Sequence, residues 1–106
     1  MGLGDVYKRQ ALGNCAYDYD NQRRIGETEG GITSLVGLLR HGSEKVQKYA
    51  AGALGNCACG NPDNQSRIGE TEGGIAGLVG LLSHGSAEVQ EYAAYALGEC
   101  AKNKTN

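Results

Sequence analysis

Residues 41–58 read HGSEKVQKYAAGALGNCA, and residues 84–101 read HGSAEVQEYAAYALGECA. The two stretches differ at five places, namely 44/87, 45/88, 48/91, 52/95 and 56/99. A wider alignment of residues 21–57 with 64–100 leaves 28 of 37 pairs identical, at an offset of 43 residues. Self-similarity at such a period is typical of proteins that stack copies of one structural unit.

A partial third copy lies upstream, because ALGNC at 11–15 matches the ends of both later copies. The first ten residues, MGLGDVYKRQ, break the apolar pattern, and their GDVYKRQ string resembles a translated cloning adapter. We therefore divide the chain into the following parts: a non-native leader (1–10), the end of a partial first repeat (11–19), a second repeat (20–61), a third repeat (62–102) and a tail (103–106).

The apolar residues of 43–59 recur at steps of three and four, which predicts an amphipathic helix with one buried face. Ser43 precedes this helix as an N-cap, and Ser86 does the same in the next copy. Two shorter helices are predicted before each long one, the first of them over 20–28 and 63–71. No segment alternates with period two, so the expected class is all-α.

Composition and charge limit the classes of ligand to be expected. The 106 residues carry a net charge of −2, which gives no general affinity for nucleic acid or anionic membranes. No apolar run approaches the roughly 18 residues that cross a bilayer, and no secretory signal is visible. We therefore expect a cytoplasmic or nuclear protein with protein partners, and neither nucleic acid nor membrane as a ligand.

The repeated unit resembles the armadillo repeat. The resemblance is carried by GGITSLVGLLRHGSEKVQKYAAGALGNCA (30–58) and GGIAGLVGLLSHGSAEVQEYAAYALGECA (73–101). It implies a right-handed α-solenoid of three-helix repeats, whereas the rival HEAT-like solenoid has two helices per unit. Thr33 and Ala76 stand where the family often has proline.

The resemblance also implies a function. Armadillo proteins line a concave groove with the third helix of each repeat, so the chain is expected to be a protein-interaction scaffold that binds an extended peptide. It is expected to be no enzyme and to need no cofactor or metal. The changed positions 45, 48, 52 and 56 project away from the predicted core, where either drift or specialisation explains them. The predicted peptide-binding residues are Asn14, Lys45, Lys48, Gly52, Asn56, Glu88, Glu91, Tyr95 and Glu99.

Charge and amide chemistry refine this expectation. The second repeat presents lysines and the third presents glutamates, which predicts acidic ligand residues over the former and basic ones over the latter. The alternative is that these charges pair with each other across the repeats. Asn14 and Asn56 keep the peptide-binding asparagine that the resemblance implies, but Glu99 does not. Recognition of basic signals by a nuclear-import adaptor is a further alternative, although no tryptophan stands four residues before these positions.

Four cysteines suggest an alternative of another class, namely thiol or metal-dependent activity at Cys57 and Cys59. Cys15, Cys57 and Cys100 occupy one core position in successive copies, which favours small buried hydrophobic residues. Cys59 is expected on the outward side of the helix. No second cysteine pair or histidine pair completes a zinc site.

Neither terminal repeat of the chain has the polar outer face of a capping repeat. Solenoids need such caps and about three repeats to remain soluble alone. We therefore expect a fragment of a longer array that self-associates through its leucine- and isoleucine-lined ends.

Overall fold

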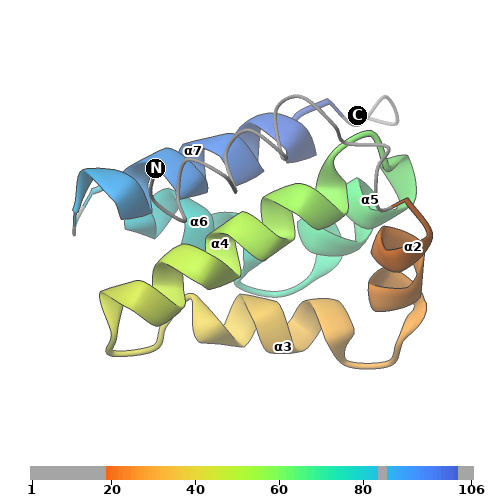
Figure 1. Cartoon of the computed structure of the whole chain (residues 1–106), viewed down its shortest axis with the longest axis horizontal. Helices are drawn as coiled ribbons and strands as arrows, with labels where there is room; N and C mark the ends of the chain where they lie inside the picture. The colour runs from red at the N-terminus through yellow and green to blue at the C-terminus, as the bar shows by residue number, and fades with distance from the viewer. Residues whose placement is uncertain (1–18, 84–85, 103–106) are drawn as a thin grey trace.

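The computed structural model describes residues 19–83 and 86–102, and in these ranges it holds helices and no strand (Figure 1). The all-α prediction is therefore confirmed. The leader 1–10, the part of 11–19 before Tyr19, Asn14 and the tail 103–106 lie outside the described residues. The helices are α2 (Tyr19–Glu27), α3 (Gly31–Leu38), α4 (Glu44–Ala58), α5 (Pro62–Glu70), α6 (Gly74–Leu81) and α7 (Ala87–Cys100).

The helix boundaries follow from local sequence. The Ser43 hydroxyl accepts a hydrogen bond from Val46 N (3.4 Å), and the Ser86 hydroxyl accepts one from Val89 N (3.3 Å), so both predicted N-caps are present. Pro62 occupies the first turn of α5, where its missing N–H has no cost. In the described ranges, no helix is long and apolar enough to span a bilayer.

Gly30 and Gly73 turn the chain into α3 and α6. Their φ angles are 81° and 83°, in the left-handed region that residues with a Cβ rarely adopt. The turn thus requires glycine at the first position of the Gly-Gly pair in each repeat.

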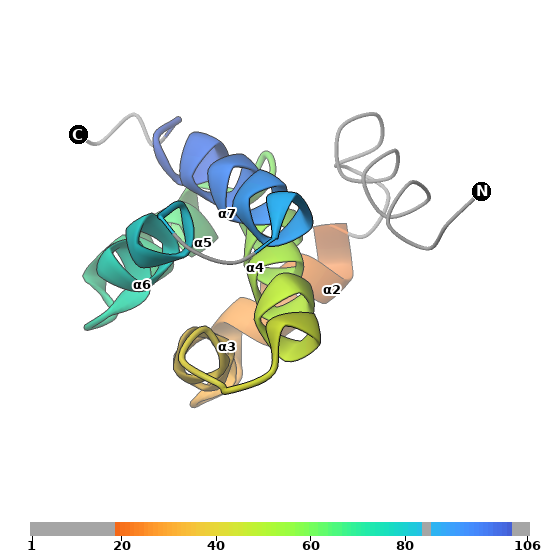
Figure 2. The same ribbon diagram turned by 90° about the vertical axis from the view of Figure 1, so that its left-hand side faces the viewer.

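The two repeats pack as neighbouring sets of three helices. Figure 2 shows α6 and α7 as one pair beside α3 and α4, and both views place α4 next to α7. Each repeat contributes its apolar stripe to a shared core, and burial of that stripe is the main stabilising term. The core includes Ile32, Val36, Leu39, Ala50, Leu54, Ile68, Leu78, Leu81, Val89, Ala93 and Ala96.

The prediction of a single buried face on α4 is wrong. Ala50 and Leu54 are buried as expected, but Ala51, Gly55 and Ala58 on another face are buried too. The reason is that α4 packs against α7 in addition to the helices of its own repeat: a Cβ built on Gly55 would overlap the Tyr95 ring. Small residues on this second face let the two third helices approach closely.

Side-chain amides satisfy the carbonyl groups at the end of α4. The last four carbonyls of a helix have no partner within the helix, and leaving them bare when buried is costly. Here three amides from α2 and α5 supply the donors. Gln22 Nε2 donates to Cys59 O (3.0 Å), Asn64 Nδ2 to Cys57 O (2.9 Å) and Gln65 Nε2 to Ala58 O (2.9 Å).

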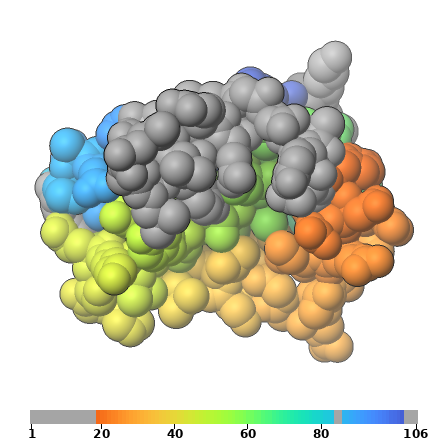
Figure 3. Space-filling model, viewed as in Figure 1, coloured from red at the N-terminus to blue at the C-terminus, as the bar shows by residue number. Residues whose placement is uncertain are grey.

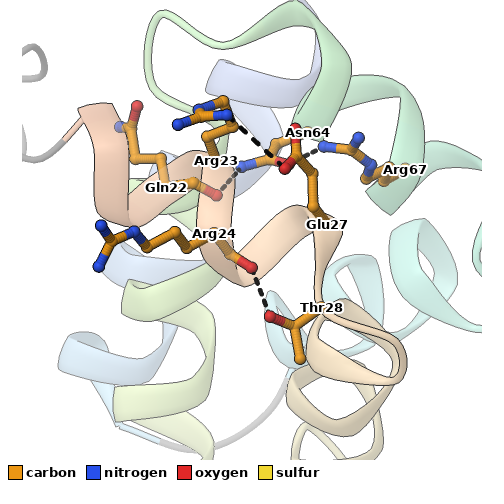
Figure 4. A network of polar contacts seen from close by, with 7 residues as sticks. All are labelled: Gln22, Arg23, Arg24, Glu27, Thr28, Asn64 and Arg67. Carbon is orange, nitrogen blue, oxygen red and sulfur yellow. Dashed lines mark hydrogen bonds and ion pairs between the residues drawn. The ribbon is translucent and has the colours of Figure 1, made fainter.

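Asn64 also fixes α2 against α5. Its side chain is fully buried, its Nδ2 donates to Gln22 O (2.8 Å), and its Oδ1 accepts from Arg67 Nη1 (2.7 Å; Figure 4). A Cβ built on Gly26 would overlap that Oδ1, so only glycine fits there. Asn64 is therefore a structural joint between neighbouring repeats.

Candidate functional site

The predicted site residues lie on two adjacent helices. Lys45, Lys48, Gly52 and Asn56 belong to α4, and Glu88, Glu91, Tyr95 and Glu99 belong to α7. We call these eight residues the third-helix surface. Asn14, the ninth predicted residue, lies outside the described residues.

An ion pair joins the two helices near their N-terminal ends. Lys48 Nζ lies 3.4 Å from Glu88 Oε2, and it also lies 4.9 Å from the centroid of the Tyr49 ring. The Lys48 side chain is only 17% exposed, whereas Glu88 is 58% exposed. Figure 3 shows the blue atoms of α7 beside the yellow-green atoms of α4 at this end of the molecule. This ion pair agrees with the alternative interpretation, in which lysine and glutamate of neighbouring repeats pair with each other.

A second contact between the repeats involves another of the five changed positions. Ser86 N, at the start of α7, donates to Glu44 Oε1 (3.1 Å). A carboxylate is favourable there because the N-terminus of a helix carries partial positive charge. The sequence analysis did not assign this contact to Glu44. The change from Glu44 in one copy to Ala87 in the next was the sign of it that the sequence offered.

Besides Glu88, the charged residues Lys45 and Glu91 are exposed on the third-helix surface. Lys45 lies in the first turn of α4, and Glu91 lies in the second turn of α7. Both side chains are accessible to a ligand in solution.

Gly52 and Glu99 do not face outward as predicted, because both are buried. Gly52 presents only backbone, and positions 48 and 56 flank it one helical turn away on either side. Glu99 is 6% exposed, and its Oε2 lies 3.1 Å from Lys102 Nζ. Its Oε1 has no hydrogen-bond partner in the described structure. This carboxylate is therefore a poor contact for a basic ligand side chain.

Asn56 and Tyr95 are half-buried and take part in the fold. The Asn56 carbonyl accepts a hydrogen bond from Gln22 Nε2 (2.5 Å). The Tyr95 ring packs over Gly55, where it spaces α7 from α4. Tyr95 thus fills the contact between repeats in addition to bordering the surface.

The cysteines provide no evident reactive thiol. Burial raises the pKa of Cys57 to about 11; burial, and then the Glu99 charge, raise the pKa of Cys100 to about 11. Both thiols are protonated at neutral pH, whereas nucleophiles and metal ligands are thiolates. Cys59 is buried rather than outward, because α4 ends at Ala58 and the helical projection stops there.

The metal alternative gains no support from side-chain placement. Over the described ranges, no three His, Cys, Asp or Glu side chains come together in a group that could hold a metal ion. Cys57 lies in the core among apolar residues.

Comparison with known proteins identifies the repeated unit. Residues 28–59 and 61–102 match the family described as Armadillo/beta-catenin-like repeat, which is more than half of the chain. No curated protein and no solved structure gave a match. The two matched segments coincide with the α3–α4 and α5–α7 regions, and repeats of this kind generally mediate protein–protein interaction. The chain therefore belongs to the armadillo repeat family.

Proposed function

We propose that the protein is an interaction scaffold that holds an extended segment of a partner protein along the third-helix surface. One observation carries the proposal: the third helices of two neighbouring armadillo repeats lie side by side and expose charges of opposite sign, Lys45 on α4 and Glu91 on α7. Binding of a partner segment gives these exposed charges a role, and the proposal requires neither catalysis nor a cofactor.

The arrangement of charges suggests the order of residues in the ligand. Neighbouring helices lie about 10 Å apart, comparable to the Debye length at physiological salt, so a ligand experiences the two charges separately. An acidic ligand residue is favoured near Lys45, and a basic one near Glu91. Lys48 and Glu88 contribute less, because each already neutralises the other.

A peptide array tests this order of charges. The labelled chain, applied at nanomolar concentration, is compared with the variant Lys45→Glu/Glu91→Lys, which should reverse the preferred order. The matched control is Lys48→Glu/Glu88→Lys, which exchanges two charges but retains their ion pair and should leave the preference unchanged. An unchanged preference in the first variant would contradict the proposal.

The same array separates the two modes of recognition. Selection of peptides that join an acidic half to a basic half supports the proposal. Selection of uninterrupted basic peptides would instead favour recognition resembling that of a nuclear-import adaptor.

Two further proposals accompany this function. A cytoplasmic or nuclear location rests on sequence composition, and imaging of a fluorescent fusion in cells tests it. Self-association through the ends of the repeat stack rests on apolar residues of α6 and α7, and sedimentation velocity over a concentration series tests it.

A further inference from the structure

The turn between α3 and α4 carries a serine that is accessible from solution. Arg40, His41 and Gly42 are exposed, and Ser43 is half-buried at the point where α4 begins. A Cβ built on Gly42 would meet nothing within 4 Å, so the space around the turn is open. Figure 1 shows the turn at one end of the molecule. A second protein can therefore approach this turn from solution.

The Ser43 hydroxyl takes part in one long hydrogen bond. It accepts from Val46 N at 3.4 Å, which is longer than the usual N–H···O distance of about 2.7–3.2 Å. A hydroxyl has a second lone pair and a hydrogen of its own, and this contact uses neither. Ser83, by contrast, donates its hydroxyl hydrogen to Gly80 O (2.9 Å). The Ser43 oxygen thus keeps the lone pair and the proton that a nucleophilic attack requires.

The surroundings of Ser43 differ in charge from those of its counterpart Ser86. The Ser43 N–H donates to the imidazole Nδ1 of His41 (3.0 Å). The equivalent N–H of Ser86 donates to the Glu44 carboxylate (3.1 Å), which reaches it from the neighbouring repeat. A negative charge added at Ser86 would therefore lie beside an existing one, whereas the Glu44 side chain is drawn away from Ser43 toward α7.

The residues that precede the two serines differ at one position. RHGS at 40–43 becomes SHGS at 83–86. Arg40 is exposed, and a guanidinium offers a planar fork of N–H donors that pairs with carboxylates. Basophilic protein kinases present carboxylates to an arginine that stands three residues before the serine they modify. Arg40 therefore supplies a recognition element for Ser43 that the third repeat lacks.

We propose that Ser43 is a phosphorylation site for a basophilic serine/threonine kinase. Ser43 Oγ forms a bond to the γ-phosphorus of ATP, the bond from that phosphorus to the bridging oxygen breaks, and ADP leaves. The hydroxyl proton passes to a base of the kinase. Ser86 is a poor substrate, because its phosphate would be repelled by the Glu44 carboxylate. The inference does not depend on the proposed binding of a partner segment.

Phosphorylation of the folded chain tests the proposal. The full chain is incubated with Mg-ATP and an active calmodulin-dependent protein kinase, a basophilic enzyme, below the unfolding temperature, and mass spectrometry maps the products. The wild type should gain phosphate on Ser43. Arg40→Ser, which copies the third repeat, should slow this at least about tenfold, because a charge-assisted contact with the kinase is lost. Ser43→Ala should abolish it, and the matched control Arg24→Ser, at an exposed arginine of α2, should not change the rate.

A transplanted motif tests the role of the fold. Ser83→Arg gives the third repeat the same RHGS sequence, but Ser86 should stay a poor substrate while Glu44 lies beside it. Ser83→Arg/Glu44→Ala should make Ser86 a substrate as well. Unfolded chains lack the contact between Glu44 and Ser86, so rapid modification of Ser86 in Ser83→Arg alone would indicate reaction of unfolded molecules.

Three outcomes would overturn the proposal. They are the absence of phosphate from Ser43 in the wild type, an unchanged rate in Arg40→Ser, and modification of Ser86 in Ser83→Arg as fast as that of Ser43. Circular dichroism of each variant checks that the chain is folded under the conditions of the reaction.

Discussion

The second and third repeats share most of their residues but place them in different surroundings. Leu39 is 3% exposed and its counterpart Leu82 is 40% exposed. Asn64 is fully buried with three polar partners, while its counterpart Asn21 is exposed. Equal residues therefore have unequal roles, because burial depends on which repeat lies next to them. Matched substitutions at equivalent positions measure that difference directly.

The largest difference is expected for the leucine pair. Leu39→Ala should lower the free energy of unfolding by about 2–5 kcal/mol, because it removes apolar contacts and leaves a cavity. Leu82→Ala should change it by less than about 1 kcal/mol. Urea unfolding of both variants, at a concentration too low for association, provides the comparison. Equal losses would show that α6 is covered in the monomer.

The asparagine pair should come next. Asn64→Ala removes donors from two carbonyls and leaves them buried, at a cost of about 2–4 kcal/mol. Asn21→Ala changes an exposed side chain and should cost at most about 0.5 kcal/mol. Thermal unfolding by circular dichroism distinguishes them. Similar melting temperatures would mean that the joint between α2, α4 and α5 adds little stability.

The buried thiol predicts an effect of pH. The pKa of Cys57 rises from 9.0 to about 11 on folding, so the neutral thiol favours the folded state. This contribution is complete below pH 9 and is lost as pH rises through about 11. It corresponds to about 2–3 kcal/mol. Stability measured from neutral to alkaline pH should fall less in Cys57→Ala than in the wild type. Parallel curves would contradict the assignment.

The glycine pair should show the smallest effect, with opposite signs. Gly55→Ala forces the Tyr95 ring and the α7 backbone to move, at about 1–2 kcal/mol. Gly98→Ala meets nothing within 4 Å and should stabilise the helix by up to about 1 kcal/mol. The double variant Gly55→Ala/Tyr95→Ala should lose less free energy of unfolding than the sum of the losses in the two single variants. A Gly55→Ala variant as stable as the wild type would argue against close packing of α4 and α7.

Much of the fold was predictable from short stretches of sequence. Apolar spacing, Ser43 and Ser86 as N-caps, and Pro62 in a first turn locate the helices, because these features act within one or two turns. The exposure of Lys45 and Glu91 followed from the same spacing. The outward orientation of Gly52 and Glu99 did not hold, and the second buried face of α4 was not foreseen.

Those exceptions were decided by tertiary contacts. Gly55 is buried because Tyr95 of the next repeat lies over it, and Gln22, Asn64 and Gln65 become caps only when α2 and α5 meet the end of α4. Helical periodicity is a property of neighbouring residues in the chain. Burial at the second face depends on a helix 43 residues away, which the periodicity of α4 alone cannot specify.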